Sequence, residues 1–272
     1  MNTFRIFTKR NFKNTERYNV FLDYGKGEEY AFSVDEYVLT TFAIRKGQNL
    51  TDDEIAEIQY EDHVKKAHNL ALTYLSYRMR SVKEVQQYLQ TKEMGDDAIR
   101  RAIEKLLEYR YLNDLEFAKA YVRTHMRTNS KGPGLLKQEL IEKGITGPDI
   151  EESLLEYDEE LQFENALKLI EKTRKKSQKQ SEKMMKQKAK TTLLTKGFDL
   201  SLITKALHEV SLEKDEDEQW EALKKQGEKA HRRYRKYEDF QYTQKMKTHL
   251  YQKGFPLEQI NKLLDHLAQQ ND

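Results

Sequence analysis

A short motif that recurs along the chain constrains the fold more than any other feature of the sequence. In residues 193–207, LLTKGFDLSLITKAL, a leucine stands four positions before Gly197, a lysine directly before it, and apolar residues one, six and ten positions after it. Further copies occupy residues 140–154, 250–264 and, with one departure, 89–103. Because the copies recur roughly every 50 to 60 residues, the sequence predicts a tandem repeat architecture.

Each copy has the pattern of a helix, a tight turn and a second helix. A glycine just past a helix accepts the left-handed backbone that ends it, and a lysine in the last turn interacts favourably with the helix dipole. Leu193 and Phe198 occupy the two positions whose side chains touch in a Schellman ending. The next helix begins at once, since Thr146 and Asp199 suit N-caps and Pro256 suits a first helical turn.

The copy at 89–103 departs from the motif, because Glu93 stands in the glycine position. A left-handed conformation costs a non-glycine residue roughly 1 to 2 kcal/mol. We therefore expect either that this turn is built differently, through Gly95, or that it is strained.

A further amphipathic helix precedes each copy, so the repeating unit has three helices. Three short helices bury little apolar surface alone, and neighbouring units are therefore expected to stack into an elongated array. The predicted fold is mostly α, with four stacked three-helix repeats behind a small mixed α/β module. The expected boundaries are 1–60 for the N-terminal module and 61–110, 111–158, 159–211 and 212–272 for the repeats.

The N-terminal module is predicted from a change in pattern. Two strand-like runs flank Gly25–Gly27, which favours a β-hairpin with a short glycine loop. Two helices should follow, the first reaching about Ile44. Their starts have the spacing of capping boxes, formed by Ser33 with Glu36 and by Thr51 with Glu54.

Composition limits the class of protein and the cellular compartment that the sequence is compatible with. Only 37% of the residues are apolar and 35% are charged, which favours a surface-rich shape over a large globule. The chain has no cysteine, which excludes disulfides, thiolate metal sites and cysteine nucleophiles. No apolar run approaches the roughly 20 residues that cross a bilayer, and the N-terminus lacks the apolar core of a signal peptide. We expect a bacterial-type cytoplasmic protein without a membrane partner.

The net charge of +2 conceals two strongly basic stretches. Rows of lysine and arginine at helical spacing follow phosphates or meet acidic protein surfaces, and tyrosines among them stack on unpaired bases. On one continuous helix the first stretch would form a cationic face, although the repeat alignment predicts a break near residues 177–181. A solvated face is an equally ordinary explanation of either stretch. The candidate binding residues are Lys172, Arg174, Lys175, Lys176, Lys179 and Lys183 in the first stretch and Lys225, Lys229, Arg232, Arg233 and Lys236 in the second.

No arrangement of residues typical of an enzyme is found. The seven histidines are dispersed, and the spacing of the nearest pair, His63 and His68, puts their rings on different helix faces. Residues 131–138, KGPGLLKQ, lack the order of a phosphate-binding loop and suit a helix start at Pro133. Neither a nucleophile beside a base nor a metal-ligand spacing is present. We expect no catalytic residue, no metal and no cofactor, and a protein that is not an enzyme.

Residues 111–145 carry the most distinctive combination in the chain. It consists of Tyr111, Leu112, Asn113, Asp114, Phe117, Ala118, Arg127, Gly132, Leu140, Lys143, Gly144 and Ile145. This combination resembles the RecX family, bacterial regulatory proteins of the recombinase RecA, and the resemblance extends over the repeats from about residue 64 onward. The N-terminal hairpin is similar to that of the longer Gram-positive members.

The resemblance implies a non-enzymatic regulator built from tandem three-helix repeats. It implies binding along the groove of a RecA filament on single-stranded DNA, with inhibition of recombinase, ATPase and coprotease activities in DNA repair and the SOS response. We expect a monomer. Arg127 and Lys131, beside the first loop of their repeat, join the candidate contacts, although a cation capping helix carbonyls equally explains Arg127. The basic stretch from Lys172 to Lys190 matches no family motif.

Two competing functions remain open at the level of sequence. The first is a protein that binds single- or double-stranded DNA directly, without RecA, through the same basic helices. Its distinguishing property would be tight and steeply salt-dependent binding to single-stranded DNA alone. The second is a helical scaffold for an unrelated partner.

Overall fold

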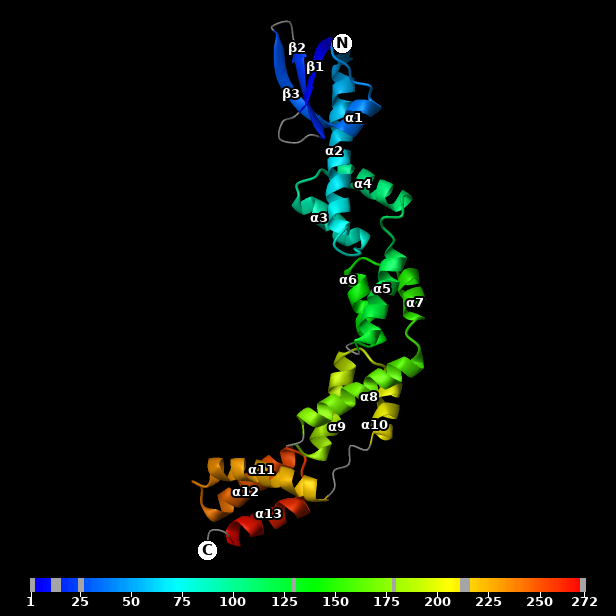
Figure 1. Cartoon of the computed structure of the whole chain (residues 1–272). Coiled ribbons are helices and arrows are strands. Elements are labelled where there is room, and N and C mark those ends of the chain that lie inside the picture. Colours follow the sequence, from blue (N-terminus) through cyan, green and yellow to red (C-terminus); the bar gives the residue numbers. More distant parts are fainter. Residues whose placement is uncertain are drawn as a thin grey trace. The chain divides into compact units, whose positions relative to one another are not determined.

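The computed structural model describes residues 3–10, 16–23, 27–128, 131–177, 180–210 and 216–269, the first of these segments by its backbone alone. Within them lie four strands and thirteen helices (Figure 1). They divide between two compact units, residues 1–118 with 142–149 and residues 119–141 with 150–272, and each unit is described by itself. The predicted mostly α fold, with three-helix repeats behind a small β-containing module, is confirmed.

The N-terminal module is an antiparallel sheet in the order β3-β2-β1-β4. Its strands are β1 (Thr3–Arg10), β2 (Arg17–Asp23), β3 (Glu28–Asp35) and β4 (Asn49–Thr51). The predicted hairpin is formed by β2 and β3, in which Arg17 pairs with Asp35 and Asp23 with Glu28. Of the expected glycine loop, Gly27 donates its N–H to Asp23 Oδ1 at 3.0 Å, and residues 24–26 lie outside the described residues. Strands β1 and β4 were not expected from the sequence.

The predicted capping box of Ser33 and Glu36 is wrong. β3 continues through Ser33 to Asp35, and the Ser33 hydroxyl donates across the hairpin to Asn19 Oδ1 at 2.8 Å. Asp35 is the N-cap of the short helix α1 (Glu36–Thr41), accepting from the Tyr37 N–H at 2.9 Å. The strand pairing uses the serine side chain, so the cap passes to the next residue with a short carboxylate.

Helix α2 (Asp52–Leu75) joins the sheet module to the helical repeats. Its predicted capping box is confirmed, because Thr51 and Glu54 exchange both of the expected hydrogen bonds. Asp62, in the middle of α2, is 6% exposed and accepts from Arg17 Nη2 at 2.6 Å and from the Asp35 N–H at 2.7 Å. One carboxylate thereby fixes α2 to both strands at the open end of the β2–β3 hairpin. The predicted module boundary at residue 60 falls inside this continuous helix.

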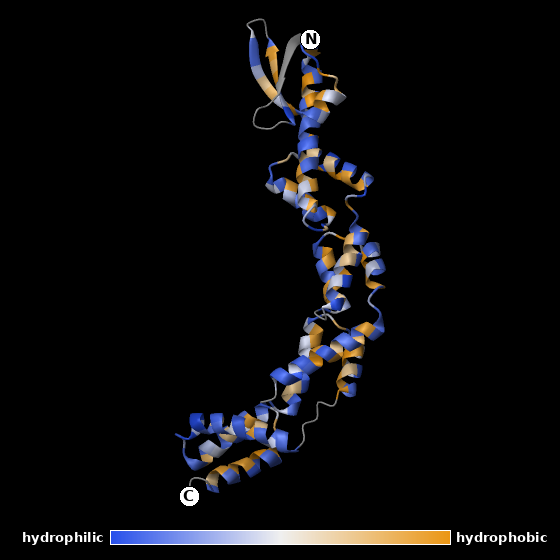
Figure 2. Ribbon diagram, viewed as in Figure 1, coloured by the Kyte–Doolittle hydropathy of each residue, from blue (hydrophilic) through white to orange (hydrophobic). Residues whose placement is uncertain are grey.

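The remaining helices follow one another in trios (Figure 1). The first trio is α2, α3 (Val82–Thr91) and α4 (Asp96–Glu108), and the second is α5 (Asp114–Arg127), α6 (Pro133–Glu142) and α7 (Gly147–Leu154). The third is α8 (Glu159–Lys176), α9 (Glu182–Thr195) and α10 (Leu200–Glu209), and the fourth is α11 (Glu216–Tyr234), α12 (Asp239–Gln252) and α13 (Leu257–Gln269). Figure 2 shows polar and apolar residues on the same helices throughout, as amphipathic packing requires.

The turn after the second helix of each trio, called the stop turn below, has the predicted geometry. Gly144, Gly197 and Gly254 have φ of 84°, 81° and 82°. In the third trio the Phe198 N–H donates to Leu193 O at 3.1 Å and the Gly197 N–H to Leu194 O at 2.9 Å, which is the Schellman pattern. Both Leu193 and Phe198 are buried in the core of that trio.

The first trio makes the same turn without glycine. Glu93 has φ of 57°, and the Met94 N–H donates to Leu89 O at 3.3 Å. Gly95 has an ordinary φ of −67° and serves as the N-cap of α4. Of the two alternatives that the sequence left open, the strained turn is therefore the correct one.

The stop turns of the second, third and fourth trios each pack against the start of the second helix of the preceding trio. The Ser81 hydroxyl donates to Lys143 O at 2.8 Å, the Gly132 N–H to Lys196 O at 2.7 Å, and the Ser181 hydroxyl to Lys253 O at 2.5 Å. In all three cases the acceptor belongs to the lysine that precedes the stop glycine. We call this recurring contact the joint.

The joint explains why the stop position needs glycine beyond its positive φ. A Cβ on Gly197 would lie 2.1 Å from the Leu135 nitrogen, and one on Gly254 would lie 2.8 Å from the Ser181 hydroxyl. Glu93 is exposed, and among the described residues no hydrogen bond from another trio reaches its turn. A side chain is therefore tolerated there at the cost of backbone strain alone.

Candidate functional site

The predicted binding residues gather at the carboxyl ends of the first helices of the trios. The last turn of α5 contains Arg127, that of α8 contains Arg174, Lys175 and Lys176, and that of α11 contains Arg232 and Arg233. A cation at this end of a helix interacts favourably with the helix dipole, which gives each of them a local structural reason. What distinguishes the trios is how many of these charges are engaged by other side chains.

In the first two trios the cations of this region are mostly engaged. Arg78 forms a forked pair with Glu84, with nitrogen–oxygen distances of 3.1 and 3.3 Å, and the guanidinium of Arg80 lies 4.1 Å from the ring centroid of Tyr74. That ring stacks on Tyr88 with centroids 4.0 Å apart. These arginines stabilise the first trio by closing its loop onto its own core.

Lys131, a predicted contact, is held in the same way in the second trio. Its ammonium lies 2.6 and 2.7 Å from the two carboxylate oxygens of Glu139 and 3.3 Å from the Tyr121 hydroxyl. Burial alone would lower the pKa of Lys131, but the hydrogen bonds to Glu139 and Tyr121 outweigh it and raise that pKa. Burial alone would raise the pKa of Glu139, but the hydrogen bonds from Lys131 and Tyr121 outweigh it. The pKa of Glu139 is therefore lowered. The pair keeps its charges across the neutral range.

Arg127 differs from Lys131 although the two are near in sequence. It is exposed at the end of α5, and no ion pair to it is found among the described residues. Its guanidinium is therefore available to a partner.

The first basic stretch is divided between two helices. α8 ends at Lys176 and α9 begins at Glu182 behind its N-cap Ser181, so the predicted break near residues 177–181 is confirmed and the stretch is not one continuous face. Lys172, Lys175, Lys176 and Lys183 are exposed, and Arg174 lies 3.3 Å from Glu171 in a half-buried pair. Lys179 lies outside the described residues.

The second basic stretch is the most exposed of the cationic regions. Lys225, Lys229, Arg232, Arg233 and Lys236 all lie exposed along α11 and the turn after it. Tyrosines lie among them, with Arg233 5.5 Å from the Tyr234 ring centroid and Lys236 5.5 Å from that of Tyr237. Their charges therefore sit against aromatic rings.

Two further residues of this region were not predicted. Lys245, on α12, lies 4.6 Å from the Tyr237 ring centroid, and Phe240, the second residue of α12, is 80% exposed. The N-cap of α12 is Glu238, which holds the position of Ser81 in the first trio and Ser181 in the third. The spacing of the basic residues alone does not mark Lys245 or Phe240.

Sites of two other kinds are absent from the described part of the chain. No group of three or more histidine, aspartate and glutamate side chains there could hold a metal ion. Among the helices that the structure describes, none is both long enough and apolar enough to cross a membrane.

Family models match most of the chain. The model of the RecX N-terminal domain matches residues 9–51, those of the first and second RecX three-helix domains match 67–106 and 113–154, and that of the third matches twice, at 159–207 and 216–264. The fourth trio is thus similar to the third.

Whole proteins give the same relationship. The chain is 48% identical over 252 residues to the regulatory protein RecX of Bacillus subtilis (strain 168), covering 93% of this chain and 94% of that one, and 47% identical to that of Bacillus velezensis. A crystal structure of regulatory protein RecX aligns with a TM-score of 0.66 and 34% identity, covering 76% of this chain and 100% of that one. RecX from Lactobacillus salivarius aligns with a TM-score of 0.52 and 37% identity over 56% of this chain and 99% of that one. The chain belongs to the RecX family of regulatory proteins.

Proposed function

We propose that the protein is a cytoplasmic, monomeric and non-enzymatic regulator that binds the RecA nucleoprotein filament and inhibits its recombinase, ATPase and coprotease activities, within DNA repair and the SOS response. The observation that carries the proposal is the membership of the RecX family over 93% of the chain. A repeat protein suits a filament, because similar surfaces recur along both partners.

The contact surface that we assign is a set of exposed cations at the ends of α5 and α8, at the start of α9, and along α11 and the turn after it. Arg127, Lys172, Lys175, Lys176 and Lys183 belong to it, together with Lys225, Lys229, Arg232, Arg233 and Lys236. Exposed cations steer association with an acidic surface and weaken with salt. Lys131 is left out, since its charge is already neutralised by Glu139.

The test follows the DNA-dependent ATP hydrolysis of RecA from the same organism while the protein is added below the RecA concentration. The binding variant carries Lys225→Gln, Lys229→Gln, Arg232→Gln, Arg233→Gln and Lys236→Gln. A matched control carries five lysine-to-glutamine changes at exposed positions away from the helix ends, Lys66, Lys137, Lys188, Lys205 and Lys262. We expect wild type and control to suppress hydrolysis and the binding variant to require several times more protein.

The order of addition separates the possible modes of inhibition. If the protein acts only when it is added before RecA assembles, it blocks filament growth. If it acts equally on complete filaments, it occludes the groove or promotes disassembly, and light scattering distinguishes these two. Unchanged hydrolysis at every ratio would overturn the proposal.

A further inference from the structure

The turn between α11 and α12 carries an unusual concentration of accessible aromatic rings. Phe240 is 80% exposed, and the rings of Tyr234 and Tyr237 lie with centroids 6.4 Å apart at 47°. A single exposed apolar side chain is ordinary on a protein surface, and Leu155 and Tyr77 are about as exposed as Phe240. What distinguishes Phe240 is that the half-buried Tyr237 and several cations belong to the same turn.

Cations surround these rings without acidic partners. Lys236 and Lys245 both lie against Tyr237, and Arg233 lies against Tyr234. Among the described residues none of these three forms an ion pair, although Glu238 and Asp239 are close in sequence. The positive charge is therefore not neutralised by the protein itself.

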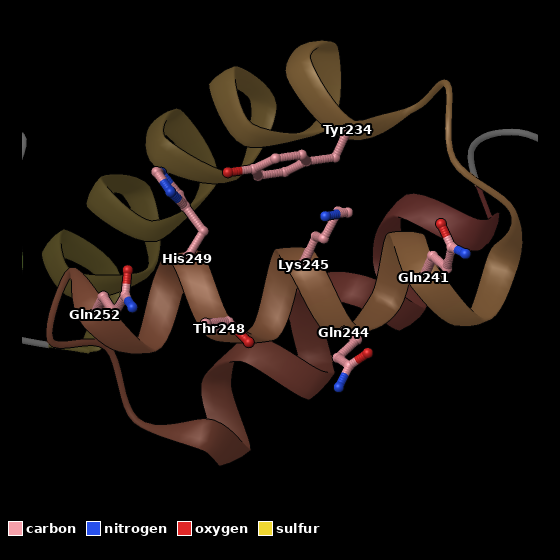
Figure 3. Close-up of a pocket in the computed structure, with 7 residues that line it drawn as sticks. All are labelled: Tyr234, Gln241, Gln244, Lys245, Thr248, His249 and Gln252. Atoms are coloured by element: carbon pink, nitrogen blue, oxygen red, sulfur yellow. The ribbon is translucent and has the colours of Figure 1, made fainter.

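A groove between α11 and α12 adjoins this turn. It encloses about 560 Å³ and is lined by Tyr234, Gln241, Gln244, Lys245, Thr248, His249 and Gln252. Figure 3 shows the side chains of Tyr234, Lys245 and His249 lying in the space between the two helices. The lining offers amide donors and acceptors, an aromatic face and a cation, and it contains no carboxylate.

The other trios show why the position of Phe240 is informative. The second residue of the second helix is Lys83, Gly134 or Lys183 in the earlier trios, and there a stop turn packs against it, although all three residues remain exposed. A Cβ on Gly144 would lie 2.8 Å from Lys83 Cβ and one on Gly254 3.1 Å from Lys183 Cβ, and the Gly134 N–H donates to Gly197 O at 2.9 Å. Phe240 occupies the same place with no stop turn of the described chain upon it. The fourth trio thus lacks the stop-turn contact that the earlier trios have at this position.

We propose that the α11–α12 turn and the adjoining groove bind a short segment of unpaired nucleic acid. Bases stack on Phe240 and Tyr237, and Arg233, Lys236 and Lys245 contact the phosphates. Stacking on aromatic rings combined with a cationic track is the chemistry by which proteins hold single strands without reading sequence. An acidic protein surface would use the cations but would leave the exposed rings and the amide-lined groove without a role. The site requires no filament protein, so it goes beyond the proposed function.

The test measures fluorescence anisotropy of a labelled oligothymidylate of about 20 nucleotides, a length that covers a typical single-strand site, with the full chain and no other protein. Phe240→Ala removes a stacking ring, and Tyr251→Ala is its matched control, since Tyr251 is 59% exposed on the same helix but at the opposite end from the α11–α12 turn. Stacking contributes about 1 to 3 kcal/mol per base, so Phe240→Ala should weaken binding at least about fivefold and Tyr251→Ala should not.

A second variant tests the phosphate contacts. Lys236→Gln with Lys245→Gln should weaken binding and reduce the slope of log affinity against log salt, by about 0.7 for each phosphate that the protein no longer neutralises. Circular dichroism confirms that each variant is folded. A duplex of equal length should bind more weakly, because its bases are not available to the rings.

Three results would overturn the proposal. One is no binding of the oligonucleotide at moderate salt, and another is equal weakening by Phe240→Ala and Tyr251→Ala. The third is that Lys236→Gln with Lys245→Gln weakens the inhibition of RecA but leaves oligonucleotide binding unchanged. That result would assign the α11–α12 turn to binding of the filament protein instead. Because the binding assay contains no RecA, its failure is distinguishable from failure of the proposed function.

Discussion

At the scale of single residues, the backbone angle φ and the nearest neighbour determine whether a stop turn requires glycine or tolerates a side chain. Gly197 needs a positive φ and leaves no space for a Cβ beside Leu135, whereas Glu93 has the positive φ without a close neighbour in another trio. The backbone strain at Glu93 can therefore be removed by substituting glycine.

Glu93→Gly should stabilise the first trio. Relief of roughly 1 to 2 kcal/mol of strain is opposed by the roughly 0.5 to 1 kcal/mol by which glycine favours the unfolded chain, so we expect a net gain of up to about 1.5 kcal/mol. Hydrogen exchange of the α3 and α4 amides should slow severalfold. Glu93→Ala retains the strained backbone and serves as the control. Equal slowing in both variants would show that the carboxylate, and not the backbone, was responsible.

Lys131 and Arg127 should respond differently to the same substitution. Lys131→Gln leaves Glu139 without its partner in a half-buried site and should cost about 1 to 2 kcal/mol, between the values for exposed and buried pairs. Arg127→Gln removes only the interaction of an exposed cation with the helix dipole and should cost less than about 1 kcal/mol. Hydrogen exchange of α5 and α6 gives the comparison. Unaltered exchange with Lys131→Gln would mean that the pair is not a structural element of the second trio.

At the scale of elements, those with a local chemical signal were predictable. The stop glycines, the α2 capping box and the break between α8 and α9 follow from interactions within a few residues of each other. β4 could not be predicted in this way, because a strand of only three residues, Asn49–Thr51, is defined by its partner rather than by its own sequence. The same reason explains the error at Ser33, whose hydroxyl is used by the neighbouring strand. That reason does not apply to the eight-residue β1, which was not expected from the sequence.

The packing of α11 on α12 should make the fourth trio sensitive to pH. Burial, together with Lys253 and Arg233, lowers the pKa of His249 below its ordinary value of 6.5. Well above pH 6.5, His249 is neutral in both the folded and the unfolded chain. As the pH falls below 6.5, His249 binds a proton in the unfolded chain before it does so in the folded chain. The free energy of unfolding should therefore fall between pH 7 and the lowered pKa.

Trp220, the single tryptophan, lies on α11 and reports this transition by its fluorescence. The urea midpoint should decrease as the pH is lowered from 7.5 to 5, and His249→Gln should flatten the decrease. A parallel pH dependence in wild type and variant would assign the effect to other groups.

At the scale of the whole molecule, the joints connect trios that the sequence could only identify as repeats. Their acceptors are main-chain carbonyls, Lys143, Lys196 and Lys253, and their donors are Ser81, the Gly132 amide and Ser181. No side-chain pattern reveals a carbonyl acceptor far away in the chain. For the candidate site the cations could be listed from the sequence, but the pairing of Lys131 and the exposure of Phe240 required the fold.

In a repeat protein, stability is a sum of unit terms and of terms between neighbours, so a joint should transmit a local change. Ser181 is the N-cap of α9 in the third trio and donates to Lys253 in the fourth. Ser181→Ala removes the cap and leaves the Lys253 carbonyl without this donor, at a cost of about 1 to 3 kcal/mol in total. The urea midpoint reported by Trp220 should fall, although Trp220 lies in the other trio.

Asp199→Ala is the matched control, because Asp199 caps α10 within the third trio through its bond to the Ser201 N–H. It should weaken the third trio by a similar amount and leave the Trp220 midpoint nearly unchanged. If both substitutions lowered that midpoint equally, the third and fourth trios would be coupled through their whole interface. If Ser181→Ala left it unchanged, the joint would contribute no coupling. A selective effect of Ser181→Ala would identify the joint as the nearest-neighbour term that joins one repeat to the next.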